Sequence, residues 1–114
     1  MHCFLIVEDE PLIAMDLKFA FEDEGAGAVT AVDCNEALAE MAKHTFTGAV
    51  LDVNLGRGET CEEAAAELKR RHIPFVLHTG DLNRVGEFLR GLGAPILAKP
   101  RPAEDVVRFA LGMI

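Results

Sequence analysis

Acidic, hydroxyl and basic side chains stand at the ends of short apolar runs in this sequence. Glu8, Asp9 and Glu10 follow the first run, CFLIV, and Asp52 ends a later run, GAVLD. Carboxylates this close together repel one another, and partial burial raises the cost of each negative charge. We therefore expect positive charge beside them, and several hard oxygen ligands favour Mg²⁺ as its source.

Two further side chains complete a possible phosphate site. Thr79 follows the apolar run PFVLH, and Lys99 follows PILA. A metal ion, an ammonium group and a hydroxyl can share the oxygens of a phosphoryl group, while a carboxylate can attack phosphorus and form an acyl phosphate. Asp52 is the best candidate for that nucleophile, because it ends a central strand whereas Glu8 and Asp9 pair up beside it.

The apolar runs predict the strands that would position these side chains. Most runs are apolar on both faces, as in the interior of a parallel sheet covered by helices. The predicted strands are Cys3–Val7, Ala28–Val32, Ala49–Asp52, Phe75–His78 and Ile96–Ala98. Helical patterns alternate with them, which predicts an α/β fold, a (βα)5 doubly wound sandwich. Ligands of such sheets bind outside the carboxyl ends of the strands, so the candidate residues should meet at one edge.

Start and stop signals place the helices between these strands. The start signals are Pro11, the capping-box pairs Asp33 with Glu36 and Thr60 with Glu63, and Pro102. Gly25 ends the first helix, and the last helix runs to the end of the chain. The fourth helical segment, Leu82–Leu92, contains two glycines and is the weakest of the predicted helices.

Composition and charge limit the possible functions. The 114 residues suffice for one domain with a core, and half of them are apolar. A net charge of −8 argues against sequence-independent binding to nucleic acid or to an anionic membrane, since both need clustered lysine and arginine. Three widely spaced cysteines and no signal-peptide pattern favour a reducing, cytoplasmic location. We expect residues 1–114 to form one domain without an output domain.

These residues, in this order, resemble the receiver domain of bacterial two-component response regulators. The resemblance covers essentially the whole chain and rests on VEDE after the first strand, LDVNL at the third, TG after the fourth and KP after the fifth. It implies a CheY-like, flavodoxin-like fold, in which a five-stranded parallel sheet of order 2-1-3-4-5 carries helices on both faces.

The resemblance also implies roles for the acidic residues. Asp52 would be the phosphoacceptor, and a histidine kinase or a histidine phosphotransfer protein would supply the phosphoryl group in a Mg²⁺-dependent reaction. Asp9, Asp52 and the backbone carbonyl of Asn54 would hold Mg²⁺, with Glu8 acting through water. The domain would catalyse its own phosphorylation and dephosphorylation without being an enzyme in the usual sense.

The remaining site residues follow from the same resemblance. Thr79 and Lys99 would bind phosphoryl oxygens, and the Lys99–Pro100 peptide would be cis. Asp81 flanks the site and would modulate the access of water. Ile96 stands where receivers commonly carry Tyr or Phe, whose ring rotates inward as the threonine moves to the phosphoryl group. An aliphatic side chain has no ring to rotate, so the aromatic half of the switch is missing.

The fourth strand suggests a narrower relationship. PFVLHTG resembles an alphaproteobacterial subgroup whose fourth strand reads Pro-Phe-x-Phe-Ala-Thr-Gly, and LDVNLGRGE also suits that subgroup. Leu77 and His78 depart from its Phe and Ala. His78 adjoins Thr79 and could face either the site or the core, and we expect no catalytic role for it.

Three other functions compete with a phosphorylated receiver. A pseudo-receiver would keep the fold and bind partners without accepting phosphate; Ile96 favours it and the complete set of site residues opposes it. A phosphohydrolase commonly uses a second Asp two residues after its nucleophile, where this chain has Asn54. A flavin-binding module needs hydrogen-bond donors after the first strand, where this chain has acids.

The last helix could provide an interaction surface. Its apolar residues exceed one buried stripe: Val106, Val107, Phe109, Ala110, Met113 and Ile114. Either part of this surface is core and the rest belongs to a frayed end, or the last strand and its flanking helices form a homodimer. The signal would leave by contact with a downstream protein, which the sequence does not identify, or by onward phosphotransfer.

Overall fold

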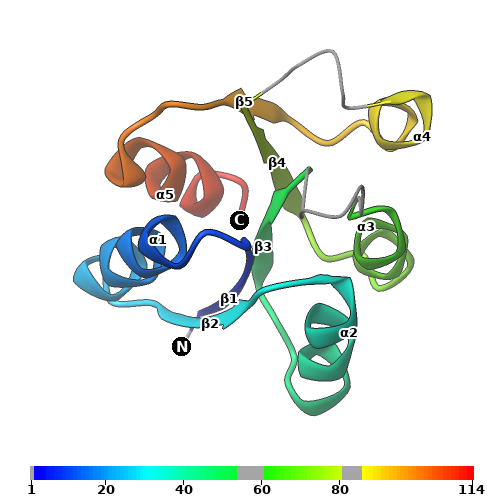
Figure 1. Cartoon of the computed structure of the whole chain (residues 1–114). Coiled ribbons are helices and arrows are strands. Elements are labelled where there is room, and N and C mark those ends of the chain that lie inside the picture. Colours follow the sequence, from blue (N-terminus) through cyan, green and yellow to red (C-terminus); the bar gives the residue numbers. More distant parts are fainter. Residues whose placement is uncertain (1, 54–60, 81–85) are drawn as a thin grey trace.

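Parallel strands form one sheet with helices on both faces (Figure 1). The computed structural model describes residues 2–53, 61–80 and 86–114. The strands are β1 (Cys3–Val7), β2 (Gly27–Ala31), β3 (Gly48–Asp52), β4 (Phe75–Thr79) and β5 (Ile96–Ala98). The helices are α1 (Pro11–Asp23), α2 (Cys34–Lys43), α3 (Glu62–Arg70), α4 (Gly86–Gly91) and α5 (Ala103–Leu111). The strand order is β2-β1-β3-β4-β5, so the predicted fold class and sheet order are confirmed.

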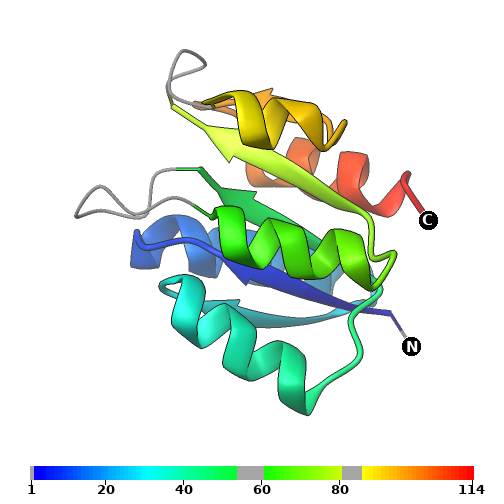
Figure 2. The same cartoon turned by 90° about the vertical axis from the view of Figure 1, so that its right-hand side faces the viewer.

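The sheet separates two hydrophobic cores, and this explains why its strands are apolar on both faces. Helices α1 and α5 cover one face, and α2, α3 and α4 cover the other (Figures 1 and 2). Successive side chains of a strand point to opposite faces. Leu5 and Leu51 therefore pack towards α2, α3 and α4, whereas Phe4, Ile6 and Val50 pack towards α1 and α5.

Both ends of α1 lie where the sequence signals predict them. Pro11 is the first helical residue. At the other end, the N–H of Ala26 donates to the carbonyl of Phe21 and the N–H of Gly25 donates to that of Glu22, each at 3.0 Å. These two bonds form a Schellman motif, and the φ of +83° at Gly25 is one that glycine adopts without strain.

One of the two predicted capping boxes can be compared with the structure. At α2, Oδ1 of Asp33 accepts from the N–H of Glu36 at 2.8 Å, and Oε1 of Glu36 accepts from the N–H of Val32 at 3.3 Å. The second box is different. Thr60 lies outside the described residues, and the N-cap residue of α3 is Cys61, whose side chain is buried and makes no capping bond. Helix α3 therefore begins with a buried thiol at the position where a polar capping side chain is common.

The last two helices end earlier than predicted. Helix α4 (Gly86–Gly91) ends one residue before the predicted Leu92, and residues 82–85 of the predicted helix lie outside the described ranges. Helix α5 ends at Leu111 and does not reach the end of the chain, because the next residue is Gly112 and glycine has a low helix propensity. Within the described ranges, no helix is long and apolar enough to cross a membrane.

Helix α5 is partly core and partly surface. Val106, Val107 and Ala110 are buried against α1 and the sheet. Phe109 and Ile114 are 40% and 49% exposed. The buried stripe thus contains three of the six apolar residues that the sequence analysis named in this helix. The homodimer stays a prediction.

Close packing around Phe4 generates a first testable expectation. The ring of Phe4 stacks on Phe21 with centroids 4.5 Å apart, and both side chains are fully buried. A Cβ atom at Gly48 would lie 2.7 Å from the Phe4 ring. We expect Gly48→Ala to lower the free energy of unfolding by about 1–3 kcal/mol, measured by urea denaturation, because the ring has no space to move.

Gly27→Ala is the matched control, since it also changes a glycine at the start of a strand. Its Cβ would have no neighbour closer than 3.7 Å, which is an ordinary contact. The free energy of unfolding should then change by less than about 0.5 kcal/mol. Equal destabilisation by both substitutions would show that the contact with Phe4 is not the cause.

Candidate functional site

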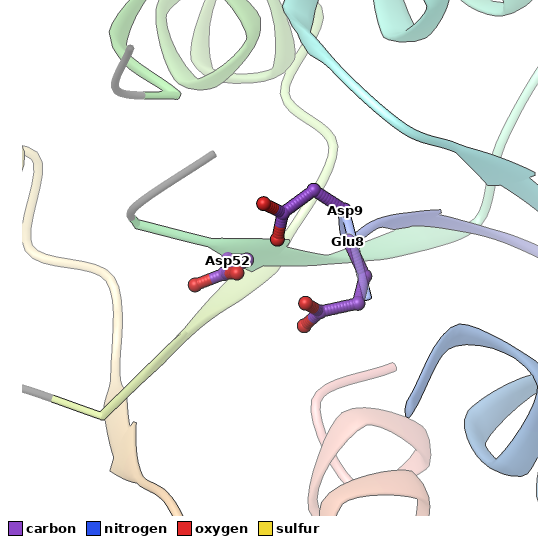
Figure 3. Close-up of side chains that lie close together, drawn as sticks. All are labelled: Glu8, Asp9 and Asp52. Atoms are coloured by element: carbon purple, nitrogen blue, oxygen red, sulfur yellow. The ribbon is translucent and has the colours of Figure 1, made fainter. Parts of the chain in front are cut away.

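The carboxyl ends of β1 and β3 bring three carboxylates together (Figure 3). Glu8 and Asp9 follow β1, and Asp52 is the last residue of β3, which pairs with β1 in parallel. One oxygen of each side chain lies within 4.8 Å of the others. Glu8 and Asp52 are buried, whereas Asp9 is exposed. The cluster therefore has two desolvated carboxylates and one that faces solvent.

Lys99 crosses the end of the sheet to reach this cluster. It follows β5, which β4 separates from β3 in the sheet. Its Nζ donates to Oε2 of Glu8 at 3.0 Å and lies 3.4 Å from Oδ2 of Asp52. Its backbone N–H donates to the carbonyl of Thr79 at 2.7 Å, and the Lys99–Pro100 peptide is cis. The ammonium group thereby connects the ends of β1, β3 and β5.

The buried carboxylates and the lysine change one another's protonation. Burial, and then the charge of Asp52, raises the pKa of Glu8 to about 7, although its hydrogen bond with Lys99 acts in the opposite direction. Burial lowers the pKa of the Lys99 ammonium, but its hydrogen bond to Glu8 and the charges of Glu8 and Asp52 outweigh that effect and raise it. The lysine is therefore firmly charged, while Glu8 is only partly ionised at neutral pH.

The donor atoms of the cluster fit a hard divalent cation. Carboxylate oxygens are the ligands that Mg²⁺ prefers. Three formal negative charges and the positive charge of Lys99 leave two negative charges, which a dication would neutralise. In the described part of the chain, Glu8, Asp9 and Asp52 are the group of three potential ligand residues close enough to hold an ion.

Two more residues, Thr79 and Glu10, lie at the same end of the sheet as the carboxylate cluster. Thr79 is the last residue of β4 and is fully buried, at the same edge of the sheet as Asp52. Glu10 is the N-cap residue of α1, but its side chain makes no capping bond. Its backbone N–H instead donates to Oε1 of Glu8 at 3.2 Å. This backbone contact binds the second carboxylate oxygen of Glu8. It could not be predicted from the residue types.

Three further residues of the predicted site stand apart from this cluster in what can be said of them, two because they are not described and one because it lies in the core. Asn54 and Asp81 lie outside the described residues, so their roles stay predictions. Ile96 is the first residue of β5, pairs with Leu77, and packs on the core beneath α2, α3 and α4. It occupies the core side of its strand as an ordinary aliphatic residue.

His78, which the sequence allowed to face either the site or the core, pairs in register with Asp52 of the neighbouring strand and is buried. It alternates with Leu77 along β4 and lies on the face covered by α1 and α5, beside Ile13 and Leu17 of α1. It is 3% exposed, and neither ring nitrogen has a hydrogen-bond partner among the residues that the structure describes. Burial, with the charges of Lys99 and Arg101, lowers its pKa to about 4.

Comparison with known proteins identifies the family through solved structures. No protein-family model matches the chain, and no curated protein does either. SdrG from Sphingomonas melonis Fr1 is 39% identical over 98% of this chain and 94% of that one, with a TM-score of 0.81. A CheY-like response regulator receiver domain protein from Methanospirillum hungatei JF-1 is 25% identical over 96% and 90%, with a TM-score of 0.83. The chain belongs to the CheY-like receiver domains of response regulators.

A further structure shares the fold of this receiver domain. It is the response regulator TrrA of Thermotoga maritima in complex with Mg²⁺ and BeF, at 22% identity over the whole of both chains and a TM-score of 0.84. The sequence motifs VEDE, LDVNL, TG and KP thus led to the correct family.

His78 should make the stability of this receiver domain depend on pH. Its pKa falls from 6.5 to about 4 on folding, so the unfolded chain binds more protons between these values. The free energy of unfolding should therefore decrease as the pH is lowered from 6.5 towards 4, by on the order of 3 kcal/mol. Urea denaturation at a series of pH values measures this decrease.

His78→Leu isolates the contribution of the imidazole, because other groups titrate in the same range. The difference in unfolding free energy between wild type and variant should grow in favour of the variant as the pH falls. A difference that stays constant from pH 7 to pH 4 would contradict the expected depression of the His78 pKa.

Proposed function

We propose that this receiver domain accepts a phosphoryl group on Asp52 as part of a two-component phosphorelay. The observation that carries the proposal is the position of Lys99, whose ammonium group contacts both Glu8 and Asp52 at the end of the sheet. A cation beside a buried carboxylate favours its charged form, and a carboxylate oxygen has a lone pair for attack on phosphorus.

The donor would be a phosphohistidine of a histidine kinase or of a phosphotransfer protein. An oxygen of Asp52 forms the new bond to phosphorus, and the bond from phosphorus to the histidine nitrogen breaks, with its electrons returning to the imidazole. Lys99 and the hydroxyl of Thr79 would bind the oxygens of the transferred group, which positions it and stabilises its charge. Hydrolysis of the acyl phosphate would later end the signal.

Glu8, Asp9 and Asp52, with the backbone carbonyl of Asn54, would hold Mg²⁺. When bound, the ion supplies positive charge to the phosphoryl oxygens. Two findings support this assignment: the excess negative charge of the cluster, and the Mg²⁺-BeF complex of a response regulator with the same fold.

Output would depend on contact between proteins or on onward phosphotransfer. Ile96 has no ring to move, so a signal that leaves through Thr79 would not involve the usual aromatic partner. The sequence PFVLHTG supports membership of the subgroup with Pro-Phe-x-Phe-Ala-Thr-Gly in its fourth strand. The proposed setting of this relay is the cytoplasm.

Phosphorylation of Asp52 can be tested with a small phosphodonor. Incubation with acetyl phosphate and Mg²⁺ should add one phosphoryl group to the wild-type chain, measured as the intact mass. Asp52→Asn should stay unmodified, because an amide oxygen is a poor nucleophile. Asp105→Asn, which changes an exposed carboxylate on α5, should be modified like the wild type.

A pseudo-receiver is the alternative that this experiment separates. The aliphatic Ile96, packed on the core, is the observation that favours it. If the wild-type chain acquires no phosphate from acetyl phosphate or from a purified partner kinase, the pseudo-receiver is the better description. Modification of Asp52→Asn to the wild-type extent would show that another residue is the acceptor.

Removal of Mg²⁺ should lower the stability of the chain. A ligand that binds only the folded state adds about 2.7 kcal/mol when its concentration is about a hundred times Kd. Thermal unfolding in Mg²⁺ and in EDTA measures this difference. Asp9→Asn should reduce it, because Asp9 is the exposed member of the cluster and its substitution removes a ligand charge without disturbing the core.

Asp23→Asn is the control for general effects of charge, since Asp23 is exposed at the far end of α1. It should leave the response to Mg²⁺ unchanged. An equal response to Mg²⁺ in the wild type and in Asp9→Asn would contradict the assignment of Asp9 as a ligand.

A further inference from the structure

Large apolar side chains are exposed on and beside α1. Leu12 is 79% exposed, and Met15 and Phe19 of the same helix are about half exposed, as is Val32, which follows β2. Met15, Phe19 and Val32 also line a groove of about 320 Å³ between α1 and the end of β2. These four residues, the α1 surface, expose on the order of 400 Å² of apolar area, and a patch of that size often marks an interaction site.

Helix α1 lies at the β2 edge of the sheet, beside α5 (Figure 1), and has two apolar faces. Leu17 and Phe21 are buried in the core on one face, whereas Leu12, Met15 and Phe19 are exposed on the other. Separations of three and four residues place the exposed side chains on one stripe, and two helices pack side by side with this spacing in a coiled coil. The stripe occupies two turns of the helix, so it can support a short contact with a second helix.

Charged residues on the two sides of this stripe complement one another between two copies of α1. Lys18 precedes Phe19 on one side of the stripe, and Asp23 lies on the other side, five residues further along the helix. In the heptad that begins with Leu12 these are a g position and the next e position, which face each other between two parallel helices. A twofold axis makes the pair twice. The α1 surface is thus complementary to itself, as the interface of a symmetric dimer must be.

Other charges oppose such a contact and limit its strength. The chain has a net charge of −8, and Glu22 continues the stripe beyond Phe19, where two copies would bring carboxylates close together. Repulsion between exposed charges is screened by salt over a length of about 10 Å at 0.1 M. A dimer of this chain is therefore expected to be weak at low salt and stronger at high salt. A basic partner of the same surface would show the opposite dependence.

We propose that a second copy of this chain covers the α1 surface, with the two α1 helices side by side and parallel about a twofold axis. Leu12, Met15 and Phe19 of one copy pack against the same stripe of the other, and Lys18 of each copy pairs with Asp23 of the other. A standard interface buries about 800 Å² on each partner, of which somewhat more than half is apolar, so the α1 surface exposes about the apolar area that such a dimer needs. The contact does not involve α5 and does not require phosphorylation.

Sedimentation velocity of the full chain, without a phosphodonor, measures this association directly. The protein concentration is varied from roughly 10 μM to 1 mM, the range in which weak interfaces associate. The fraction of dimer should increase with concentration. At a fixed concentration it should also increase as NaCl is raised from about 50 to 500 mM, because screening reduces the repulsion between the two acidic copies.

Two phenylalanine substitutions locate the interface. Phe19→Ser should weaken the dimer by about tenfold or more, because an aromatic side chain near the centre of the contact is lost. Phe109→Ser is the matched control, since Phe109 is a similarly exposed phenylalanine on α5, and it should leave the dimer unchanged. Both side chains are exposed at the surface, so both variants should fold.

Charge reversal tests the pairing of the two helices. Lys18→Glu should weaken the dimer by roughly two- to fivefold, and the addition of Asp23→Lys should restore it, because the pair is then made with exchanged charges. The addition of Asp105→Lys on α5 instead gives the same net charge and should not restore the dimer. Glu22→Gln should strengthen the dimer, since it removes a carboxylate from the stripe.

Three results would overturn the proposal. A wild-type chain that stays monomeric at the highest concentration and salt would show that solvent or a different protein covers the α1 surface. Loss of the dimer in Phe109→Ser but not in Phe19→Ser would place the interface on α5. Equal restoration of Lys18→Glu by Asp23→Lys and by Asp105→Lys would show that net charge, and not the pair between the two helices, controls association.

Discussion

Two almost fully buried carboxylates, those of Glu8 and Asp52, share the ammonium group of Lys99 at the end of the sheet. Burial of a charge is unfavourable unless a partner compensates it, and removal of one member of a buried pair leaves the other uncompensated. Lys99 supplies this compensation from the far side of β4. The ends of β1, β3 and β5 are therefore held together electrostatically, and the arrangement of the site depends on that contact.

The rest of the sheet makes such a concentration of charge possible. Its strands carry apolar side chains on both faces, and packing in the two resulting cores fixes the register of the strands. The polar site residues come only at the ends of the strands. Parallel strands also end at a common edge, so residues that lie far apart in the sequence meet there. The acidic cluster is thus a consequence of topology, and its excess negative charge is what makes a cation the natural ligand.

Much of this arrangement could be predicted from the sequence, because it depends on local patterns. Apolar runs predicted all five strands to within one residue of their bounds, and Pro11 and Gly25 located the ends of α1. The strand ends, read with the rule for parallel sheets, brought Asp9 and Asp52 to one edge. The motifs around them then indicated the family.

What the sequence could not predict depends on contacts between distant segments. The orientation of His78 is decided by the pleat of β4 and the helices that cover it. The N-cap position of α3 is taken by Cys61, a buried residue whose side chain makes no capping bond. The contact between the backbone of Glu10 and the side chain of Glu8 involves no distinctive residue type at all.

Lys99 borders two environments. Its ammonium group lies among the carboxylates, while the same residue also lines a small cavity next to His78, which pairs in register with Asp52. Binding at either place that favours one conformation of this side chain must alter affinity at the other place by the same factor, because linkage is reciprocal. In a receiver with an aliphatic residue at position 96, the Lys99 side chain is therefore a structural element, independent of an aromatic ring, that contacts both the carboxylates and the lining of this cavity.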